Sequence, residues 1–427
     1  MNSRHASLAS TFALALTLAL VPARKAAAQT WTAQTTNVTV NVAAIHFATE
    51  NIGYAAAGTS ILKTTNGGDI WTNIYPNEWT YRSFSFVNKD TGWAVGNGGD
   101  IRKTTNGGTT WVNQTNNGGG TTPLGHVVFA SSLAGFASRA DGTTSTGNVI
   151  RTANGGTTWI PDTIGANNRL VNKFQFLTPA IGWAIGGVGV YKTIDSGNTW
   201  ISAATGLPTV VSWNALKFVT PDIGYVAGYS EGIYKTTNGG TSWTAQLTGT
   251  FQGIGDITWN SLDCLDTSTC FASGTGGAYM PGGFVYKTTN GGAAWTQNLN
   301  LNPGVINGLV FPSAAGGYII GTNGMIRKSS AVVAILPSDA AAAHAGLRIA
   351  RSAAGWNVGY SVQADQPVTV SVLDLQGRPV WSSTASAKAG DNTLLIPASG
   401  FSAGVQILEF RSSAGRDALL LPANRLR

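Results

Sequence analysis

The sequence predicts an all-β protein: a seven-bladed β-propeller closed by its N-terminal strand and followed by a small Ig-like β-sandwich. Three observations lead to this prediction. A box of eight residues ending in Trp occurs six times, a second phrase occurs seven times, and the 427 residues include 55 Gly but only 11% charged residues. Few charges together with many Gly, Thr and Asn favour short strands and tight turns over helices.

The Trp-ended boxes set the period of the repeat. They start at residues 64, 104, 152, 193, 236 and 288, as in "TTNGGTTW" at Thr104–Trp111. Asn or Asp can hydrogen-bond its own backbone two residues on, and a following Gly supplies a positive φ. Each box is therefore predicted to be a structural turn that places a buried Trp at the start of the next strand. The Asn or Asp and Trp residues of the boxes are Asn66, Trp71, Asn106, Trp111, Asn154, Trp159, Asp195, Trp200, Asn238, Trp243, Asn290 and Trp295.

A second phrase precedes each box and marks the first strand of a unit. Six copies are anchored by Phe, as in "FVNKDTGWAVG" from Phe86, and a divergent copy is aligned on Trp259. Two positions before the anchor the residue is always apolar (Ile257 in the divergent copy), and four positions before it is mostly small or polar (Gly255 there). With a short strand ahead of each box, every unit has four short strands, which is typical of a propeller blade.

The mismatch between seven phrases and six boxes predicts how the propeller closes. The last unit, from Phe311, loses its turn at Ser329–Ala331 and no Trp follows. The segment "WTAQTT" at Trp31–Thr36 closely matches "WTAQLT" at Trp243–Thr248, which follows a box. The chain start is therefore predicted to supply the missing outer strand of the seventh blade, which removes an open sheet edge.

The two ends of the chain differ from the repeat. Residues 1–28 are expected to be an export signal with a basic start, an apolar run and small residues for cleavage after Ala23 or Ala28; an uncleaved membrane anchor is the alternative. Removal of the signal takes away three basic residues and lowers the formal charge from +7 to 23 − 19 = +4. With no Lys/Arg run and no later apolar span, nucleic-acid binding and a transmembrane segment in the mature chain are not expected.

The repeat ends at Ser330, which sets the predicted domain boundaries. The propeller is assigned to residues 29–330, a linker to 331–346 and a β-sandwich to 347–427, where short alternating runs are divided by Gly, Ser and Asp turns. Cys264 and Cys270 stand in "CLDTSTC". In an exported protein such a close pair predicts a local disulfide, and the spacing and the four scattered His predict no metal site.

The boxes resemble the Asp-box or BNR repeat of sialidases, xyloglucanases and sortilin-like receptors. The full unit, with Asp90–Trp111 its clearest copy, looks most like the photosystem II stability/assembly factor propellers, and the resemblance covers roughly residues 31–330. Near the end, "VSVLDLQGRPV" (Val370–Val380) and "SAGVQILEF" (Ser402–Phe410) resemble the carboxy-terminal sorting domain of type IX secretion. That resemblance implies export through the outer membrane by the secretion machinery, to the cell surface or medium; an ordinary accessory domain is the alternative.

No motif in the sequence assigns a catalytic residue or a cofactor. Arg102, Arg151 and Arg327 are interpreted as structural because they share a third-strand slot with Lys63 and Lys235. Arg82, Arg139 and Arg169 are left for a sialidase-like Arg triad, but no "RIP"-like motif precedes the first box. A glycosidase also needs two carboxylates, and the candidate acids near loops, Asp141, Asp222, Glu231 and Asp256, lie in no recognisable motif. A non-enzymatic binding propeller is therefore the leading hypothesis, and a glycoside hydrolase of the Asp-box type is its rival.

The binding site is predicted on one end of the propeller. There the loops between second and third strands meet the connections from one blade to the next, and these segments carry aromatic residues that the repeat does not require. A protein or polysaccharide ligand is expected to bind there, to a monomeric propeller. The candidate residues are Trp79, Tyr81, Arg82, Arg139, Lys173, Trp213, Tyr229, Glu231, Asp256 and Tyr279.

Overall fold

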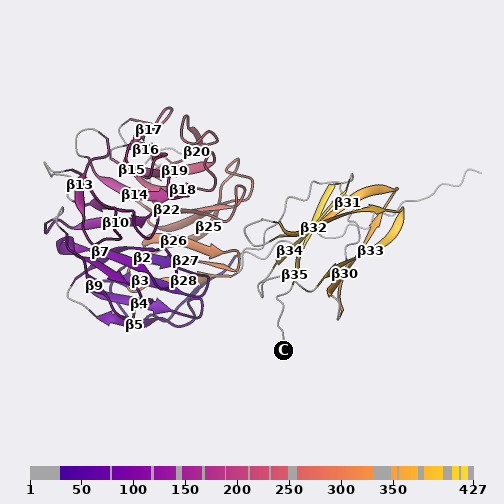
Figure 1. Ribbon diagram of the computed structural model, residues 1–427, viewed down its shortest axis with the longest axis horizontal. Helices are drawn as coiled ribbons and strands as arrows, with labels where there is room; N and C mark the ends of the chain where they lie inside the picture. The colour runs from indigo at the N-terminus through magenta and orange to yellow at the C-terminus, as the bar shows by residue number, and fades with distance from the viewer. Residues whose placement is uncertain are drawn as a thin grey trace, which may run out of the picture.

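The structure is a computed structural model, shown in Figure 1. It describes residues 29–76, 79–116, 120–140, 147–165, 169–187, 189–209, 212–229, 232–248, 257–330, 348–352, 355–373, 379–397, 406–412 and 415–421. The predicted export signal (1–28) and linker (331–346) lie outside the described residues. Within the described residues, no helix has the length and apolarity to cross a membrane.

Seven four-stranded antiparallel sheets form the repeat region. The first strands of neighbouring blades contact one another around a closed ring, so each blade runs outward from a central channel. This arrangement confirms the predicted seven-bladed propeller. From the inner to the outer strand, blade 1 is β2(Val42–Phe47), β3(Gly53–Ala57), β4(Ser60–Thr64) and β5(Thr72–Pro76); blade 2 is β6(Tyr81–Phe86), β7(Gly92–Gly96), β8(Ile101–Thr104) and β9(Val112–Asn113), with a short 3-10 helix η1(Asn97–Gly99) between β7 and β8; and blade 3 is β10(Leu124–Phe129), β11(Gly135–Arg139), β12(Val149–Thr152) and β13(Ile160–Asp162). Blade 4 is β14(Val171–Phe176), β15(Gly182–Gly186), β16(Gly189–Thr193) and β17(Ile201–Ser202); blade 5 is β18(Trp213–Phe218), β19(Gly224–Gly228), β20(Gly232–Thr236) and β21(Thr244–Leu247); blade 6 is β22(Ile257–Cys264), β23(Cys270–Gly276), β24(Gly282–Thr288) and β25(Thr296–Leu301); and blade 7 is β26(Ile306–Ser313), β27(Gly316–Gly321), β28(Ile326–Ser329) and β1(Trp31–Ala33).

The seventh blade is closed by the chain start, as predicted. Strand β1 pairs antiparallel with β28, and Trp31 lies opposite Ser329. The Trp31 ring packs edge-on against Phe311 at 6.1 Å, which is the contact that Trp71 makes with Phe47 in blade 1. The N-terminal segment therefore supplies both the outer strand and the Trp that the seventh unit lacks.

A Phe-on-Gly contact holds the first two strands of most blades together. In six blades the anchor Phe lies over a Gly at the first or second position of the second strand; a Cβ on Gly53, for example, would lie 2.7 Å from the ring of Phe47. Only Gly permits that approach. The ring also stacks on an aromatic residue of the preceding blade, as Phe129 does on Trp93 at 3.4 Å, so one Phe joins two strands and two blades.

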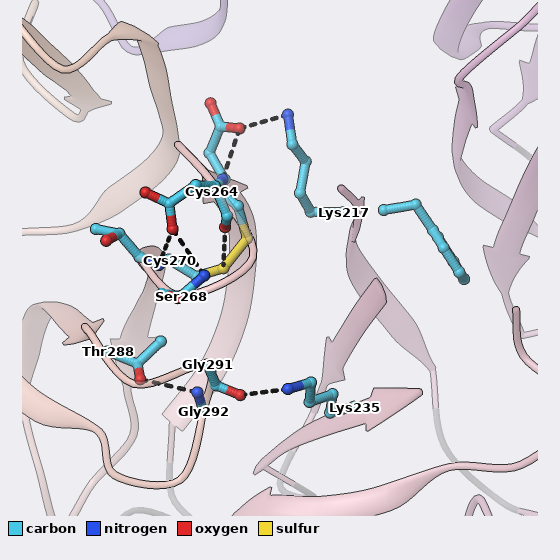
Figure 2. Close-up of a disulfide and its surroundings, with 12 residues drawn as sticks. Lys217, Lys235, Cys264, Ser268, Cys270, Thr288, Gly291 and Gly292 are labelled. Atoms are coloured by element: carbon cyan, nitrogen blue, oxygen red, sulfur yellow. Dashed lines mark hydrogen bonds and ion pairs between the residues drawn. A yellow bond between two sulfur atoms is a disulfide. The ribbon is translucent and has the colours of Figure 1, made fainter. Parts of the chain in front are cut away.

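Blade 6 replaces this contact with the disulfide, and its alignment on Trp259 was wrong. Cys264 lies opposite Cys270 in the register position that Phe47 and Gly53 occupy in blade 1. The two cysteines form the predicted disulfide (Figure 2). The anchor is therefore Cys264, and Leu262 and Asn260 take the columns given to Ile257 and Gly255. The error arose because β22, at eight residues, is longer than the first strand of blades 1–5.

The C-terminal residues form two further sheets, drawn in yellow tones in Figure 1. One has the order β29(Arg348–Ser352), β30(Gly355–Val362), β33(Gly390–Pro397); the other has the order β32(Pro379–Ala387), β31(Gln366–Leu373), β34(Gln406–Ser412), β35(Gly415–Leu421). Val358, Ile396, Val370 and Phe410 from both sheets share one buried cluster. Two sheets around one apolar core make a small β-sandwich.

Candidate functional site

The propeller has two ends of different character. We call the end that carries the boxes and the turns between first and second strands the box face. We call the other end, which carries the loops between second and third strands and the connections from blade to blade, the loop face. Residues 65–71 and 48–52 of blade 1 belong to the box face, and residues 97–100 and 79–80 of blade 2 belong to the loop face.

Each box is a closed hydrogen-bonded turn, but its Asn or Asp accepts from the backbone N–H four residues on rather than two. In blade 2, the backbone N–H of Gly108 donates to Thr104 Oγ1 at 2.8 Å, and the N–H of Thr110 donates to Asn106 Oδ1 at 2.9 Å. The Thr104 hydroxyl donates in turn to Asn106 Oδ1 at 3.1 Å. The polar side chains of the box are thus used within the turn, which leaves the carbonyl of its first Gly to face the neighbouring blade.

A cation from the preceding blade binds that carbonyl. Lys235 Nζ donates to the Gly291 carbonyl at 2.6 Å, next to the Thr288–Gly292 hydrogen bond of the same box (Figure 2). Lys103 Nζ donates likewise to Gly155 at 2.9 Å, and its charge lies 5.1 Å from the centre of the Trp93 ring. The box face is therefore a series of contacts that join blades.

The strand register corrects the assignment of this cation. The residues opposite the second-strand aromatic are Lys63, Lys103, Arg151, Lys192, Lys235, Lys287 and Lys328. Arg102 and Arg327 lie one position earlier, opposite Ala94 and Ile319. They do not share the slot of Lys63, because the two sequences "IRKT" and "IRKS" contain an additional basic residue ahead of the structural Lys.

Polar side chains of the inner strands cap the edge of the next blade. The N–H of Phe129 donates to Ser85 Oγ at 2.9 Å, and that of Phe311 donates to Asp263 Oδ2 at 2.7 Å. Four successive blades also carry Asn at one inner position; Asn260 Nδ2 donates to the Ile306 carbonyl at 2.7 Å. The inner strands would otherwise present unpaired edge groups, so most of this polarity serves the fold.

Charged and imidazole groups gather around the channel. Lys217 pairs with Asp263 at 2.6 Å, and Lys173 Nζ donates to the Asn260 carbonyl, two blades away, at 3.1 Å. Burial lowers the pKa of Lys173 to about 8. Burial also lowers the pKa of His46 to about 4 and, with the nearby charges of Lys173 and His46, that of His126 to about 3. Within the described residues, no three His, Cys, Asp or Glu side chains are grouped so that they could bind a metal ion.

The predicted binding residues divide into exposed and buried groups. Trp79, Tyr229 and Tyr279 are exposed by 37%, 60% and 55%. Arg82 is also exposed, and its Nε donates to Asn97 Oδ1 at 2.8 Å. These four residues lie on the loop face as expected.

Other predicted residues are not available on that surface. Tyr81 and Trp213 are 0% and 1% exposed, so their interpretation as exposed aromatics was wrong. Each begins the inner strand of its blade, and Trp213 packs edge-on against Tyr234 at 5.6 Å. Arg139 is buried at the end of β11, and Lys173 points to the channel. Glu231 and Asp256 lie outside the described residues.

A pocket of about 360 Å³ opens on the loop face at blade 2. Sequence reasoning found Trp79 but missed its other lining residues. These come from η1 and the residue after it, from β8, and from the end of β9 with the segment that follows. A loop sequence as rich in Asn, Gln and Gly as "NQTNNGGG" was the available signal. The lining residues are Trp79, Gly98, Gly99, Asp100, Arg102, Asn113, Gln114, Thr115, Asn116 and Gly120.

Comparison with known proteins agrees with the fold. The family model of the photosynthesis system II assembly factor YCF48 matches residues 23–173. No curated protein sequence matches the chain.

Three solved structures illustrate the range of similar propellers. YCF48 bound to a D1 peptide has a TM-score of 0.54 and 16% identity over 70% of this chain and 94% of its own. The GH74 enzyme of Niastella koreensis has a TM-score of 0.55 and 14% identity over 92% of this chain and 74% of its own. PorZ of Porphyromonas gingivalis, a surface component of the type-IX secretion system, has a TM-score of 0.52 and 13% identity over 89% of this chain and 59% of its own. The chain is thus similar in fold both to an assembly factor and to a hydrolase.

Proposed function

We propose that this protein is an exported, non-enzymatic propeller that binds a protein or polysaccharide on its loop face. The contrast between the two ends carries the proposal. The described box face uses its polar groups in contacts between blades, as Lys235 does with Gly291. The loop face instead exposes Trp79, Tyr229 and Tyr279, which the repeat does not require. Exposed aromatics beside polar groups are common in binding surfaces.

Two further observations support parts of this proposal. The Cys264–Cys270 disulfide is typical of proteins that mature in an oxidising compartment. YCF48, a propeller of the same fold, has been solved with a D1 peptide bound, so a peptide ligand is compatible with this architecture.

The rival function is glycoside hydrolysis. The similarity in fold to the GH74 enzyme is the observation that favours it. Such chemistry needs two carboxylates on either side of the bond that is cleaved. On the described part of the loop face, Asp100 is paired with Arg102 and Asp162 with Arg151. The other described acids of the propeller lie on the box face or on an inner strand: Glu50, Asp69, Asp90, Asp195, Asp222, Asp263 and Asp266. The predicted acids Asp141, Glu231 and Asp256 lie outside the described residues.

Binding and turnover can be measured on the same protein. Purified residues 29–427 would be tested for retention by immobilised polysaccharides and envelope proteins, and for sugars released from the same polysaccharides. We expect retention without product. Release of reducing ends at a rate that a control protein does not match would overturn the non-enzymatic assignment.

The C-terminal sandwich is proposed to direct surface delivery by type IX secretion. The sequence resemblance at Val370–Val380 supports this role. The structural match to PorZ also supports it, because it covers 89% of this chain and therefore extends beyond the propeller, whose last strand ends at Ser329. In a host with that system, a chain that ends at residue 346 should fold but remain in the periplasm. Delivery of the truncated chain to the surface at the full-length level would make the sandwich an accessory domain.

A further inference from the structure

We propose that the blade-2 pocket binds a single ring of a neutral sugar, stacked on Trp79. This inference rests on the proposed use of the loop face for binding and names the ligand class for one place on it. Four features of the pocket carry it: a fixed aromatic wall, a neutralised charge, a set of uncharged hydrogen-bonding side chains, and a size suited to one ring.

The aromatic wall is held in place by the backbone. The Trp79 ring lies directly against Gly98, so closely that a Cβ at that position would overlap its six-membered ring. Gly98 has a φ of 64°, which also favours Gly. With one part of the ring fixed on η1 and 37% of the side chain exposed, Trp79 forms a rigid platform. The apolar C–H face of a pyranose packs well on such a surface, because both partners bury apolar area while the sugar hydroxyls stay at the rim.

The charge in the pocket is paired, which argues against an anionic ligand. Arg102 Nε donates to both carboxylate oxygens of Asp100, at 2.9 and 3.0 Å. Asp100 is buried and the Arg102 side chain is only 18% exposed. An ion pair joined by this bifurcated hydrogen bond and shielded from water presents little net charge to a ligand.

The remaining polar wall consists of uncharged side chains. Asn113 ends the short outer strand β9, and Gln114, Thr115 and Asn116 follow it. The side-chain amide N–H of Gln114 donates to the carbonyls of Val112 and Asn113, so the side chains of Asn113, Thr115 and Asn116 are the ones offered to a ligand. Asn116 Nδ2 donates to the Gly99 carbonyl at 2.9 Å, which ties this segment to η1, the element against which the Trp79 ring packs. Amides and hydroxyls can both donate and accept, as sugar hydroxyls require.

Size and position fit one ring rather than a long chain segment. A volume of about 360 Å³ lies near the lower end of small-molecule sites. Position also marks blade 2 as special. In each inner strand one paired residue directly precedes the bulge, and in blade 2 it is Tyr81. The residue two places before that position is Val40, Thr122, Arg169, Val211, Ile257 or Gly304 in the other blades, and only blade 2 has an aromatic there.

The test uses purified residues 29–427 in affinity electrophoresis. The gels would contain hydroxyethyl cellulose, mannan or dextran as neutral polysaccharides, or alginate as an anionic one. We expect retardation by at least one neutral polymer, at least tenfold weaker binding for Trp79→Ala, and partial recovery for Trp79→Phe. Leu133→Ala is the control, because it removes a 59% exposed apolar side chain from the box face, in the turn between β10 and β11, and should bind like the parent protein.

Several outcomes would overturn the sugar pocket. These are retardation only by alginate, no retardation by any neutral polymer, or equal retardation of the parent and a folded Trp79→Ala variant. Capture of a peptide from a random peptide library that is lost in Trp79→Ala would assign the pocket to polypeptide instead. If the parent protein binds no neutral polymer but binds an envelope protein through the loop face, the proposed function stands while the sugar pocket fails. If the parent protein binds neither sugar nor protein, both proposals fail.

Discussion

The box face and the loop face are built from the same seven repeats but use their polar groups differently. On the box face, Lys103 reaches the Gly155 carbonyl of the next blade and Tyr54 donates its hydroxyl to Gly107 at 2.9 Å. On the loop face, Trp79 and Tyr229 remain exposed. Repetition therefore marks residues that join blades, and the exposed departures from the repeat are the residues that we propose to contact a ligand. Substitutions in the first group should cost stability, and substitutions in the second should cost binding.

The largest loss of stability is expected where the ring closes. Deletion of Trp31–Thr36 removes the outer strand of blade 7, the Trp31–Phe311 contact and the hydrogen bond from Trp31 Nε1 to Asn298 Oδ1 at 2.9 Å. Truncation of a buried Trp alone costs about 3–5 kcal/mol, and the lost strand adds to that. Thermal unfolding of the purified protein would measure the effect. An unchanged melting temperature would refute closure by the N-terminal strand.

The next test compares two tryptophans that looked alike in the sequence. Trp213→Ala should destabilise the propeller by about 3–5 kcal/mol, because Trp213 is fully buried against Tyr234. Trp79→Ala should change stability far less, because its side chain is partly exposed. Urea unfolding of both variants gives the two free energies of unfolding. Equal losses would remove the distinction between blade-joining and ligand-facing aromatics.

These two tryptophans also show what the sequence could predict. The blades were predictable because the box, the anchor Phe and the following Gly recur at nearly regular spacing, and each has a local physical reason. Trp213 was wrongly predicted to be exposed because it begins an inner strand directly after an irregular connection. Only the folded sheet shows that its side chain lies in a buried cluster. Asn113 and Asn116 were missed because the pocket joins segments that are not adjacent in the sequence.

Blade 6 was the divergent case for a related reason. An aromatic anchor was expected, so Trp259 was chosen, but Cys264 takes the anchor position. A periodic pattern cannot reveal that a covalent bond has replaced a ring packed on Gly, although the cysteine spacing alone was enough to predict the disulfide itself.

That replacement gives a prediction of intermediate size. Reduction of the short Cys264–Cys270 loop should destabilise the protein by about 2 kcal/mol. The double exchange Cys264→Phe and Cys270→Gly restores the pair found in six blades, so its melting temperature should no longer respond to reductant. Thermal unfolding with and without dithiothreitol tests both statements. If the exchanged protein is far less stable than the reduced parent, blade 6 requires more than the common Phe-on-Gly contact.

A smaller effect is expected from the imidazoles near the channel. The folded pKa values of His46 and His126, about 4 and about 3, lie below the ordinary value of 6.5 because burial disfavours the charged form. The unfolded chain therefore binds more protons below pH 6.5, and stability should fall as the pH falls from 6.5 towards 4. Their contribution should be fully present above pH 6.5.

A double variant separates these groups from the carboxylates. His46→Gln with His126→Gln should flatten the melting temperature between pH 6.5 and 4.5, while the Lys217–Asp263 pair near the channel is retained. Lys173 stays protonated in this range, since its folded pKa is about 8. A slope identical to that of the parent protein would assign the acid sensitivity to other groups.

The smallest stability effect is predicted for the two most exposed aromatics of the loop face. Tyr229 and Tyr279 are exposed by 60% and 55%, and substitutions at such positions usually change stability by no more than about 0.5 kcal/mol. Tyr229→Ala and Tyr279→Ala should thus unfold at nearly the parent temperature, whereas Trp213→Ala should not. If the ligand extends over the loop face beyond blade 2, either variant should weaken retention by an immobilised protein or polysaccharide without loss of fold. A large drop in melting temperature in both would show that these side chains hold the loops together. At blades 5 and 6 the loop face would then serve stability, as the box face does, rather than binding.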